Sequence, residues 1–357
     1  MRIFLRVLII LAALLLVAFC TDQSIKENKV LEAPSSPGQA LPMNNSTPIQ
    51  GENPPRPEEG LSILVGKAAS ELIKLAGEPN RIEPSAYGYE WWIYNTAYST
   101  FMMAGIKNGE VNQIYAGGES LDVMPFKIGE SLDDIYRTTI LIPEITVPIG
   151  SNIYVFTLND DDMDNRMLVA YEGVYAQLYV DEVDETLEAV RFISPEPLVL
   201  HKPYDMTYKG QLMSAETPSS ELQPAIDLAN ERQLFDLTNL FRLKHGLSVL
   251  KSDKAADVAA RLHSADMAKQ NFFSHESPKY GDLEERLTVS GIVYDAAGEN
   301  IASNYVDAAE AVHGWANSED HREVMMKESF THVGVGVFGK YYTQNFLERE
   351  PIISETK

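Results

Sequence analysis

The sequence predicts an α+β protein of two folded domains, preceded by an export segment and a polar spacer. Between residues 61 and 198, a helix-like stretch followed by short apolar strands occurs twice. From residue 224 onwards, amphipathic helical stretches precede a pair of alternating strands. The chain of 357 residues is long enough for two cores, and its apolar fraction of 45% and charged fraction of 23% are those of globular proteins.

The chain is strongly acidic. It carries 29 Lys and Arg residues against 52 Asp and Glu residues, which gives a formal net charge of −23. Such a surface repels the phosphates of nucleic acids and of anionic lipids. We therefore expect no nucleic-acid partner, and contact with a membrane only through the N-terminal segment.

Residues 1–20 have the pattern of a signal peptide or signal anchor. Arg2 and Arg6 precede an unbroken apolar run from Val7 to Phe19. A run of this length is typical of a signal-peptide core and short for a bilayer span. Extended back to Ile3 it reaches about 17 residues, the low end for spanning a bilayer. The chain is therefore expected to be exported.

Three fates of this segment are open: an uncleaved membrane anchor, lipid attachment at Cys20, or cleavage and secretion. Val17-Ala18-Phe19-Cys20 is similar to a lipoprotein signal, but Phe19 stands where a small residue is expected. Cys20 is the only cysteine, so no intrachain disulfide can form. Each fate places the folded part outside the cytoplasm, either anchored on the extracytoplasmic face of a membrane or secreted.

Residues 21–60 form the predicted spacer. They are rich in Pro, Ser, Asn, Gln and Glu, and they contain almost no aromatic residue that could begin a core. This composition is typical of a disordered, partly extended linker. It would hold the folded domains away from a membrane, within the cell envelope.

Two similar units make up the predicted domain 61–198. Each begins with a glycine, a short polar stretch and a helix start, at Val65–Leu72 and at Ile128–Ile135. Strand-like segments follow in the same order in both units. The matched segments are 92–94 with 154–156, 102–106 with 175–179, and 110–115 with 187–192. We therefore predict one α+β domain made of two internal repeats.

Two features of this domain have alternative interpretations. The acidic run Asp160–Asp164 could hold calcium, but it lacks the glycine and distal glutamate of an EF-hand, so a solvated hairpin tip is favoured. The aromatic cluster of Trp91, Trp92 and Tyr94 is expected to pack in the core and across strands rather than to form a carbohydrate platform.

A linker, 199–223, is predicted to lead to the domain 224–350. A first helix, ending at His245-Gly246, has an apolar stripe to bury, and Ser252 is the expected N-cap of a second. That stripe consists of Leu228, Leu234, Phe235, Leu237 and Phe241. His263 and Asp266 lie three apart on the second helix and are expected to form a structural pair. Val333–Phe338 and Tyr341–Leu347 are predicted to pair as strands.

Several motifs of this domain occur in an order that carries a family resemblance. They are Asn239-x-x-Arg242, Ser274-His275-Glu276-Ser277-Pro278, Gly298-Glu299-Asn300-Ile301-Ala302, Trp315 to Arg322, Gly334-Val335-Gly336-Val337 and Tyr341 to Phe346. The ordered set resembles the CAP superfamily (cysteine-rich secretory proteins, antigen 5 and pathogenesis-related 1; SCP-like), most closely its bacterial branch. Residues 61–198, with Gly88–Tyr94, look like the CAP-associated N-terminal domain. The resemblance implies an α-β-α sandwich with a cleft, but no known reaction.

In that superfamily two histidines and two glutamates line the cleft, and in some members they bind zinc or another divalent ion. His275 matches the first histidine and Glu299 the first glutamate. Ser318 stands where the second glutamate is expected, and Tyr341 where the second histidine is expected. The resemblance therefore keeps two of the four positions, and the cleft candidates are His275, Glu299, Asn300, Ser318, His321 and Tyr341.

One imidazole and one carboxylate are too few for zinc, which is held by three or four protein ligands. His321 could supply a third ligand, giving a metal set of His275, Glu299 and His321 with Tyr341 nearby. Without metal, Glu299 could fix the imidazole of His275 and raise its pKa, an arrangement suited to ligand binding or acid–base chemistry. Zinc or another divalent cation is thus the only cofactor candidate.

The predicted function is that of an exported cell-surface protein whose cleft binds a polar ligand, such as a peptide, a cell-wall component or an envelope protein. The alternative is a hydrolase, metal-assisted or acid–base, acting on peptide or cell-wall polymer through His275, Glu299 and His321. No nucleophile elbow or His-Glu-x-x-His motif supports that alternative. Two further possibilities are a purely structural role for the polar cleft residues and a functional N-terminal domain beside a vestigial cleft.

Overall fold

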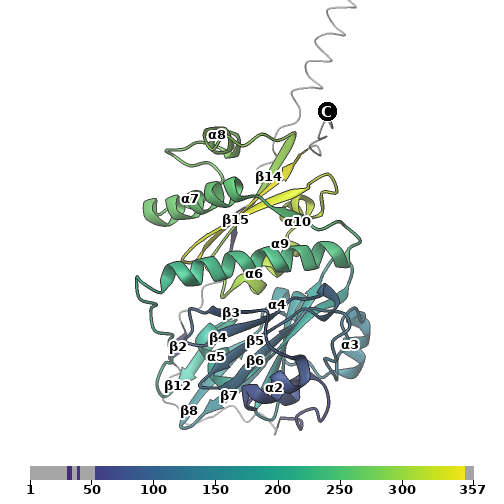
Figure 1. Ribbon diagram of the computed structural model, residues 1–357. Helices are drawn as coiled ribbons and strands as arrows, with labels where there is room; N and C mark the ends of the chain where they lie inside the picture. Colours follow the sequence, from purple (N-terminus) through teal and green to yellow (C-terminus); the bar gives the residue numbers. More distant parts are fainter. Residues whose placement is uncertain (1–29, 34–37, 41–52, 350–357) are drawn as a thin grey trace, which may run out of the picture.

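The protein is described by a computed structural model covering residues 30–33, 38–40 and 53–349. The predicted export segment 1–20, with Cys20, and most of the predicted spacer lie outside the described residues. Among the residues that are described, no helix is long and apolar enough to cross a membrane. The structure is a mixed α+β fold in which an N-terminal part and a C-terminal part are stacked on each other (Figure 1).

A seven-stranded antiparallel sheet forms most of the N-terminal part. Its strands, in spatial order, are β3 (Arg81–Pro84), β4 (Glu90–Tyr94), β5 (Met102–Lys107), β6 (Glu110–Ala116), β11 (Thr186–Ile193), β10 (Val174–Asp181) and β9 (Arg166–Tyr171). Trp91 and Tyr94 are buried and Trp92 packs at the edge of the core, so the predicted core packing of these aromatic residues is confirmed. Strands β10 and β11 are buried on both faces, which explains their nearly continuous apolar character.

A four-stranded sheet completes the N-terminal part. It consists of β2 (Gln39–Ala40), β12 (Asp205–Lys209), β8 (Asn152–Thr157) and β7 (Glu144–Ile149). The helices of this part are η1 (Leu61–Leu64), α2 (Ala69–Ala76), η2 (Tyr98–Thr100), α3 (Leu132–Thr138), α4 (Asp160–Asn165) and α5 (Pro195–His201). The end of α5 and the whole of β12 therefore fall inside the range 199–223 predicted as linker.

The two predicted repeats are not confirmed. The matched strands β5 and β6 lie beside the matched strands β10 and β11, with β6 paired to β11. However, β4 and its proposed counterpart β8 belong to different sheets. The hairpin tip predicted at Asp160–Asp164 is wrong, because these residues form α4. Asn159 and Asp162 make a capping box there, and buried Asp162 pairs with Arg166 at 2.8 Å.

The C-terminal part is the predicted α-β-α sandwich. Its sheet has the order β1 (Leu31–Glu32), β14 (Ala296–Ser303), β16 (Tyr341–Glu348), β15 (His332–Phe338) and β13 (Lys251–Ser252). Its helices are α6 (Gln223–Lys244), α7 (Lys254–Gln270), α8 (Leu283–Val289), α9 (Ala308–Ala316) and α10 (Glu319–Met326). The strand β1 comes from the predicted spacer, so residues 31–32, like β2, are structured rather than disordered.

Two glycines of β15 set the distance between this sheet and α7. A Cβ atom at Gly336 would lie 1.9 Å from the backbone nitrogen of Arg261, and one at Gly334 would lie 2.2 Å from the carbonyl carbon of Ala256. No side chain fits there, so the helix backbone packs directly on the strand. The valines between and beside these glycines pack on the other side, in the core shared with α6.

Some details of the predicted helices are wrong. The N-cap of α7 is Asp253, whose side chain accepts from the backbone N–H of Ala256, and Ser252 lies in β13 instead. Leu228 was predicted to be buried with the stripe of α6, but it is 42% exposed. The other members of that stripe pack into or against the core, because α6 is covered along most of its length by other elements.

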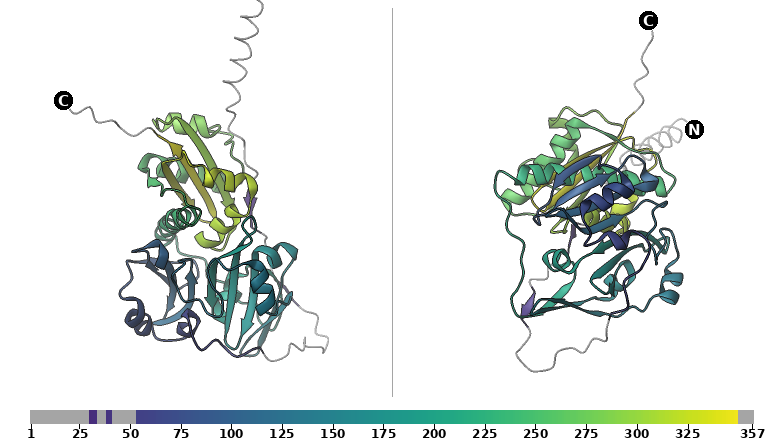
Figure 2. Two further views of the ribbon diagram at one scale, coloured as in Figure 1. Left: turned by 90° about the vertical axis from the view of Figure 1, so that its right-hand side faces the viewer. Right: turned by 60° about the horizontal axis from the view of Figure 1, so that its bottom comes forward.

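The two parts share one hydrophobic core. A single buried cluster contains Trp91 and Tyr115 of the N-terminal sheet together with Leu237 of α6 and Trp315 of α9. Figure 1 shows α6 lying between the C-terminal sheet and the N-terminal sheets, and Figure 2 shows the same stacking from two further directions. The two parts are therefore joined by apolar burial as well as by the chain connection.

Candidate functional site

The centre of the candidate site is Glu299 on β14, which is 4% exposed. Its Oε1 atom accepts a hydrogen bond from Nδ1 of His275 at 2.9 Å, and its Oε2 atom accepts one from Nη2 of Arg286 at 2.6 Å. Burial alone would raise the pKa of Glu299, but Arg286, His263 and His275 together lower it to about 2. The predicted pairing of His275 with Glu299 is therefore present, and the carboxylate is held ionised.

Arg286, on α8, also fixes the loop that carries His275. Its Nη1 atom donates to the carbonyl oxygen of His275 at 2.6 Å and to that of Gly281 at 2.8 Å. Asp282 and Glu285 form a capping box at the start of α8, which positions the arginine. A buried cation thus links the glutamate, the histidine backbone and the helix.

His263 and Asp266 of α7 do not form the predicted pair. Nε2 of His263 lies 3.1 Å from the carbonyl oxygen of Ser274 and 3.9 Å from Oε1 of Glu299, while Asp266 accepts from the hydroxyl of Ser277 at 2.7 Å. Both residues point from α7 to the loop at His275, because α7 is pressed against the same face of the sheet. Burial lowers the pKa of His263 to about 4, so its imidazole is neutral at physiological pH.

His263 is a site residue that the sequence interpretation missed. Its position on the helix that packs on Gly334 and Gly336, two strand positions without side chains, could have indicated that it belongs to the site. Glu299 faces the same side of the sheet, because its cross-strand partner Asn345 pairs in turn with Gly334. That register brings α7 and β14 side chains together.

A second histidine approaches from α10. His321 is completely buried; its Nδ1 atom lies 2.8 Å from the hydroxyl of Ser318, and its carbonyl oxygen accepts from Nδ2 of Asn300 at 3.1 Å. Burial, followed by the nearby His275, lowers the pKa of His321 to about 4. The structure therefore brings four predicted residues, His275, Asn300, Ser318 and His321, to one region around β14.

The two imidazoles have a common arrangement. In each, Nδ1 is engaged, by Glu299 for His275 and by Ser318 for His321. In each, Nε2 is buried and lacks a hydrogen-bond partner among the described residues. A buried polar atom left without a partner costs about 1–3 kcal/mol. Both nitrogens are therefore suited to a bound polar group.

The comparisons with known proteins agree with this architecture. The model of the cysteine-rich secretory protein family matches residues 235–347, and the CAP-associated N-terminal model matches residues 65–204. A relative from Bacillus subtilis (strain 168), "Uncharacterized membrane protein YlbC", is 40% identical over 307 residues, covering 86% of this chain and 89% of the relative. The chain belongs to the cysteine-rich secretory protein family. Another relative in that organism, "Uncharacterized protein YkwD", is 30% identical over 227 residues, covering 57% of this chain and 87% of the relative.

Solved structures of this family have the same fold across both parts. An extracellular protein containing a SCP domain from Bacillus anthracis str. Ames aligns with a TM-score of 0.78 at 37% identity, covering 85% of this chain and 99% of that one. A cysteine-rich secretory protein from Staphylococcus aureus subsp. aureus Mu50 aligns with a TM-score of 0.76 at 25% identity, covering 90% and 99%. The pairing of the N-terminal part with the family domain is thus shared with these relatives.

This family member does not assemble the predicted metal set. Both carboxylate oxygens of Glu299 are already held, by His275 and Arg286. Tyr341 lies opposite Ser303, four positions along the ladder from Glu299, which is roughly 13 Å at the rise of a strand. The tyrosine ring instead packs 6.2 Å from that of Phe273. Two imidazole nitrogens without a free carboxylate do not fit zinc, which needs three or four protein ligands.

Asn239 and Arg242, the family-type pair on α6, act on the backbone. Asn239 donates to the carbonyl oxygen of Leu250 at 3.2 Å and accepts from its N–H at 2.7 Å. Arg242 donates to the carbonyl oxygens of Met325 at 2.6 Å and Ser248 at 3.0 Å. These contacts give the pair a structural role, because both side chains fix the backbone of neighbouring loops.

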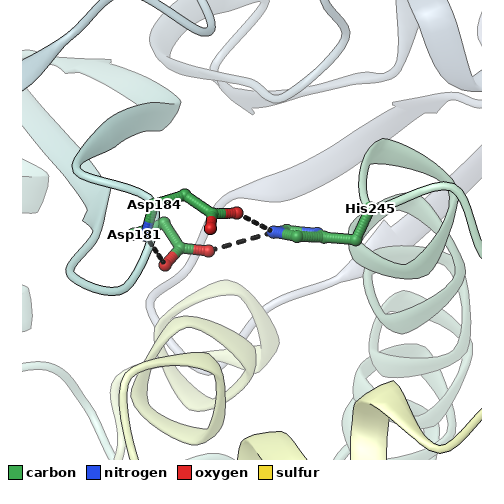
Figure 3. Close-up of side chains that lie close together, drawn as sticks. All are labelled: Asp181, Asp184 and His245. Carbon is green, nitrogen blue, oxygen red and sulfur yellow. Dashed lines mark hydrogen bonds and ion pairs between the residues drawn. The ribbon is translucent and has the colours of Figure 1, made fainter.

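A different cluster of titratable groups lies between the two parts (Figure 3). Asp181 at the end of β10 and Asp184 in the turn after it point towards His245 at the end of α6, with oxygen-to-Nε2 distances of 3.1 and 3.0 Å. Nη1 of Arg322 on α10 lies 2.7 Å from Asp181, so a cation already occupies the position between the acidic groups. The ligand atoms of Asp181, Asp184 and His245 are close enough together to hold a metal ion, but the guanidinium of Arg322 beside them would repel it.

The cluster favours the charged form of the His245 imidazole. Burial lowers the pKa of His245, but the hydrogen bonds to Asp181 and to the carbonyl oxygen of Phe241 outweigh it, and the net shift is upwards. The pKa of Asp181 is lowered, because hydrogen bonds from His245 and Arg322 outweigh its burial. No sequence motif indicated this cluster, since its members come from three distant segments.

Proposed function

We propose that this protein is exported and acts at the cell surface as a binding module, with the polar cleft at His275 and His321 as its ligand site. The observation that carries the proposal is the pair of buried Nε2 atoms without protein partners in the described part of the chain. The imidazole of His321 has a lowered pKa and is neutral, and the imidazole of His275 is oriented by Glu299, so both are positioned to make directed hydrogen bonds. A peptide or a cell-wall fragment has the amide and hydroxyl groups that such atoms bind.

The location at the cell surface is supported by two kinds of observation. The first 20 residues have the pattern of a signal peptide or anchor. One relative is named a membrane protein, and a similar solved structure is described as an extracellular protein. We infer that this chain is likewise located outside the cytoplasm, tethered to the membrane or released into the cell envelope.

The alternative of a hydrolase has weaker support. Glu299, with its pKa lowered to about 2 and both oxygens engaged, is a poor general base at neutral pH. The hydroxyl of Ser318 does lie 2.8 Å from Nδ1 of His321, as a nucleophile and its base would. The third member of such a set is lacking, because Nε2 of His321 has no orienting carboxylate among the described residues. Binding is therefore the favoured function.

The test compares wild type with His275→Gln and His321→Gln, using sedimentation with purified cell-wall sacculi and calorimetry with soluble wall peptides. His332→Gln is the matched control, because His332 is a partly exposed histidine at the start of β15. We expect each cleft variant to weaken binding about tenfold, as the loss of one directed hydrogen bond does, and the control to bind normally. Unchanged binding in both cleft variants would refute the assignment, and release of soluble fragments that stops in Ser318→Ala would establish the hydrolase instead.

A further inference from the structure

A cavity of about 640 Å³ lies between the N-terminal and C-terminal parts, and neither His275 nor His321 lines it. Its walls include Tyr87 and Leu200 from the first part and Val306 and Tyr342 from the second. Cavities of this volume at the junction of two domains are common binding places for small ligands. Neither the family models nor the predicted cleft accounts for it.

Two lysines, one from each part, line this cavity. Lys202 follows α5 and belongs to the N-terminal part, whereas Lys340 lies in the turn between β15 and β16. Lys202 donates to the hydroxyl of Ser214 at 3.2 Å, and neither lysine has a carboxylate within ion-pair distance among the described residues. In contrast, Lys107 and Lys244 pair with Glu196 and Glu188. Unpaired lysines facing one cavity are notable in a chain with a net charge of −23.

The charges around the two lysines leave room for an anion. Glu310 is buried at the cavity wall, but Arg166 lies 3.1 Å from it and neutralises it. Burial lowers the pKa of Lys340, the carboxylates of Glu310 and Asp307, each paired with an arginine, raise it, and repulsion by the ammonium group of Lys202 lowers it again. The remaining acidic residue of the wall, Glu216, is exposed to solvent, and so is Lys340, while Lys202 is partly buried. An anion between the ammonium groups would relieve this repulsion.

The cavity also has polar and apolar surfaces that suit the rest of a small organic molecule. His201 is buried at its wall, with Nε2 at 3.1 Å from the hydroxyl of Tyr89 and with Nδ1 lacking a hydrogen-bond partner in the part of the chain that is described. Burial lowers the pKa of His201 to about 3, so the imidazole is neutral. Tyr87 and Tyr342 add aromatic surface.

We propose that this cavity binds a small organic anion whose carboxylate or phosphate group lies between Lys202 and Lys340. The neutral imidazole of His201 hydrogen-bonds a polar group of the same molecule, and the tyrosines contact its carbon skeleton. Because each part supplies one lysine, the site is complete only when the two parts are packed together. This site is independent of the proposed function of the cleft.

Calorimetry on the whole protein tests the proposal with three probes: N-acetyl-dialanine, glycerol 3-phosphate, and N-acetyl-dialanine amide as the uncharged control. We expect saturable binding of at least one anion and none of the amide. Binding of the dipeptide alone would identify a peptide carboxylate as the ligand group, and binding of the phosphate alone a phosphoester. If neither anion binds saturably, or if the amide binds as well as the anions do, the proposal is overturned.

Variants then locate the bound anion. Lys202→Met and Lys340→Met should each weaken binding about tenfold or more, whereas the arginine variants at both positions should keep it within a few-fold. Lys209→Met serves as the control, because Lys209 is exposed on β12 and does not line the cavity. His275→Gln should leave anion binding unchanged, which separates this site from the cleft. Binding that survives both lysine-to-methionine changes would also refute the proposal.

Discussion

Replacing Arg191 by methionine should test how firmly the two parts of the protein are joined. Arg191 lies on β11 with a fully buried side chain, and its Nη2 atom donates to both carboxylate oxygens of Asp307 at 2.9 and 2.8 Å. Asp307 belongs to the C-terminal part, where it caps α9 by accepting from the N–H of Glu310. The guanidinium also lies 6.0 Å from the ring centre of Trp91 and 5.7 Å from that of Tyr179.

The size of the effect follows from burial. Removing one partner of a buried ion pair leaves the other charge in an apolar environment, which costs about 3–5 kcal/mol. We therefore expect Arg191→Met to lower the free energy of unfolding by about that amount at pH 7. Asp307→Asn keeps an oxygen for the helix cap, so the double variant should be less destabilised than the sum of the single ones. The expected loss is large because the ion pair is buried.

Urea denaturation followed by tryptophan fluorescence and circular dichroism measures these differences. The control is Arg137→Met, which removes an arginine that is exposed and pairs with Asp134 at 3.1 Å on the surface. That change should alter the free energy of unfolding by about 0.5 kcal/mol or less. A loss of less than about 1 kcal/mol for Arg191→Met would show that the pair is not buried between rigidly packed parts, and the reasoning would fail.

Three other predictions concern stability. The pKa of His245 is raised in the folded state, so its stabilising contribution is present below about pH 6.5, the unfolded value, and is lost as the pH rises through the folded value. The urea midpoint of the wild type should therefore fall over this range when it is measured from pH 5 to 9, and His245→Gln should remove that fall. Glu299→Gln leaves Arg286 buried without its carboxylate and should lower the free energy of unfolding by about 3–5 kcal/mol at pH 7. Because the pKa of Glu299 is lowered to about 2, the difference in stability from wild type should shrink below about pH 4.5. A difference that stays constant with pH would contradict this explanation. Gly336→Ala should destabilise by more than about 2 kcal/mol in thermal unfolding, since its Cβ meets helix backbone, whereas Gly298→Ala should cost less because a side-chain atom of Val324 at 3.0 Å can move.

The sequence predicted the parts of the fold that depend on local patterns. The alternation around Gly334 and Gly336 predicted a core strand, and the register of that strand then placed Glu299 beside α7. The resemblance to the family supplied the sandwich and the pairing of His275 with Glu299. Nothing in the sequence spacing of Arg286 showed that its guanidinium would reach the carboxylate of Glu299.

The contacts between distant segments could not be predicted in this way. Hydrophobic periodicity shows which face of an element is buried, but not which element covers it. The strand β1, drawn from a proline-rich stretch, adds to β14 through backbone hydrogen bonds that require no apolar side-chain pattern. The cluster of Asp181, Asp184 and His245 likewise depends on how the two parts are stacked.

The shared core gives the proposed anion site a consequence for the whole molecule. Lys202 and Lys340 come from different parts, which are already joined by one hydrophobic cluster and by the pair of Arg191 and Asp307. A ligand that contacts both parts stabilises only the state in which they are stacked, so its binding free energy adds to the stability of the complete protein. Tyr342 at the cavity wall and Asn345 beside Glu299 lie on the same strand, β16. Occupation of the cavity should therefore reduce local opening of β16, and hydrogen exchange of β16 amides with and without the bound anion measures that effect.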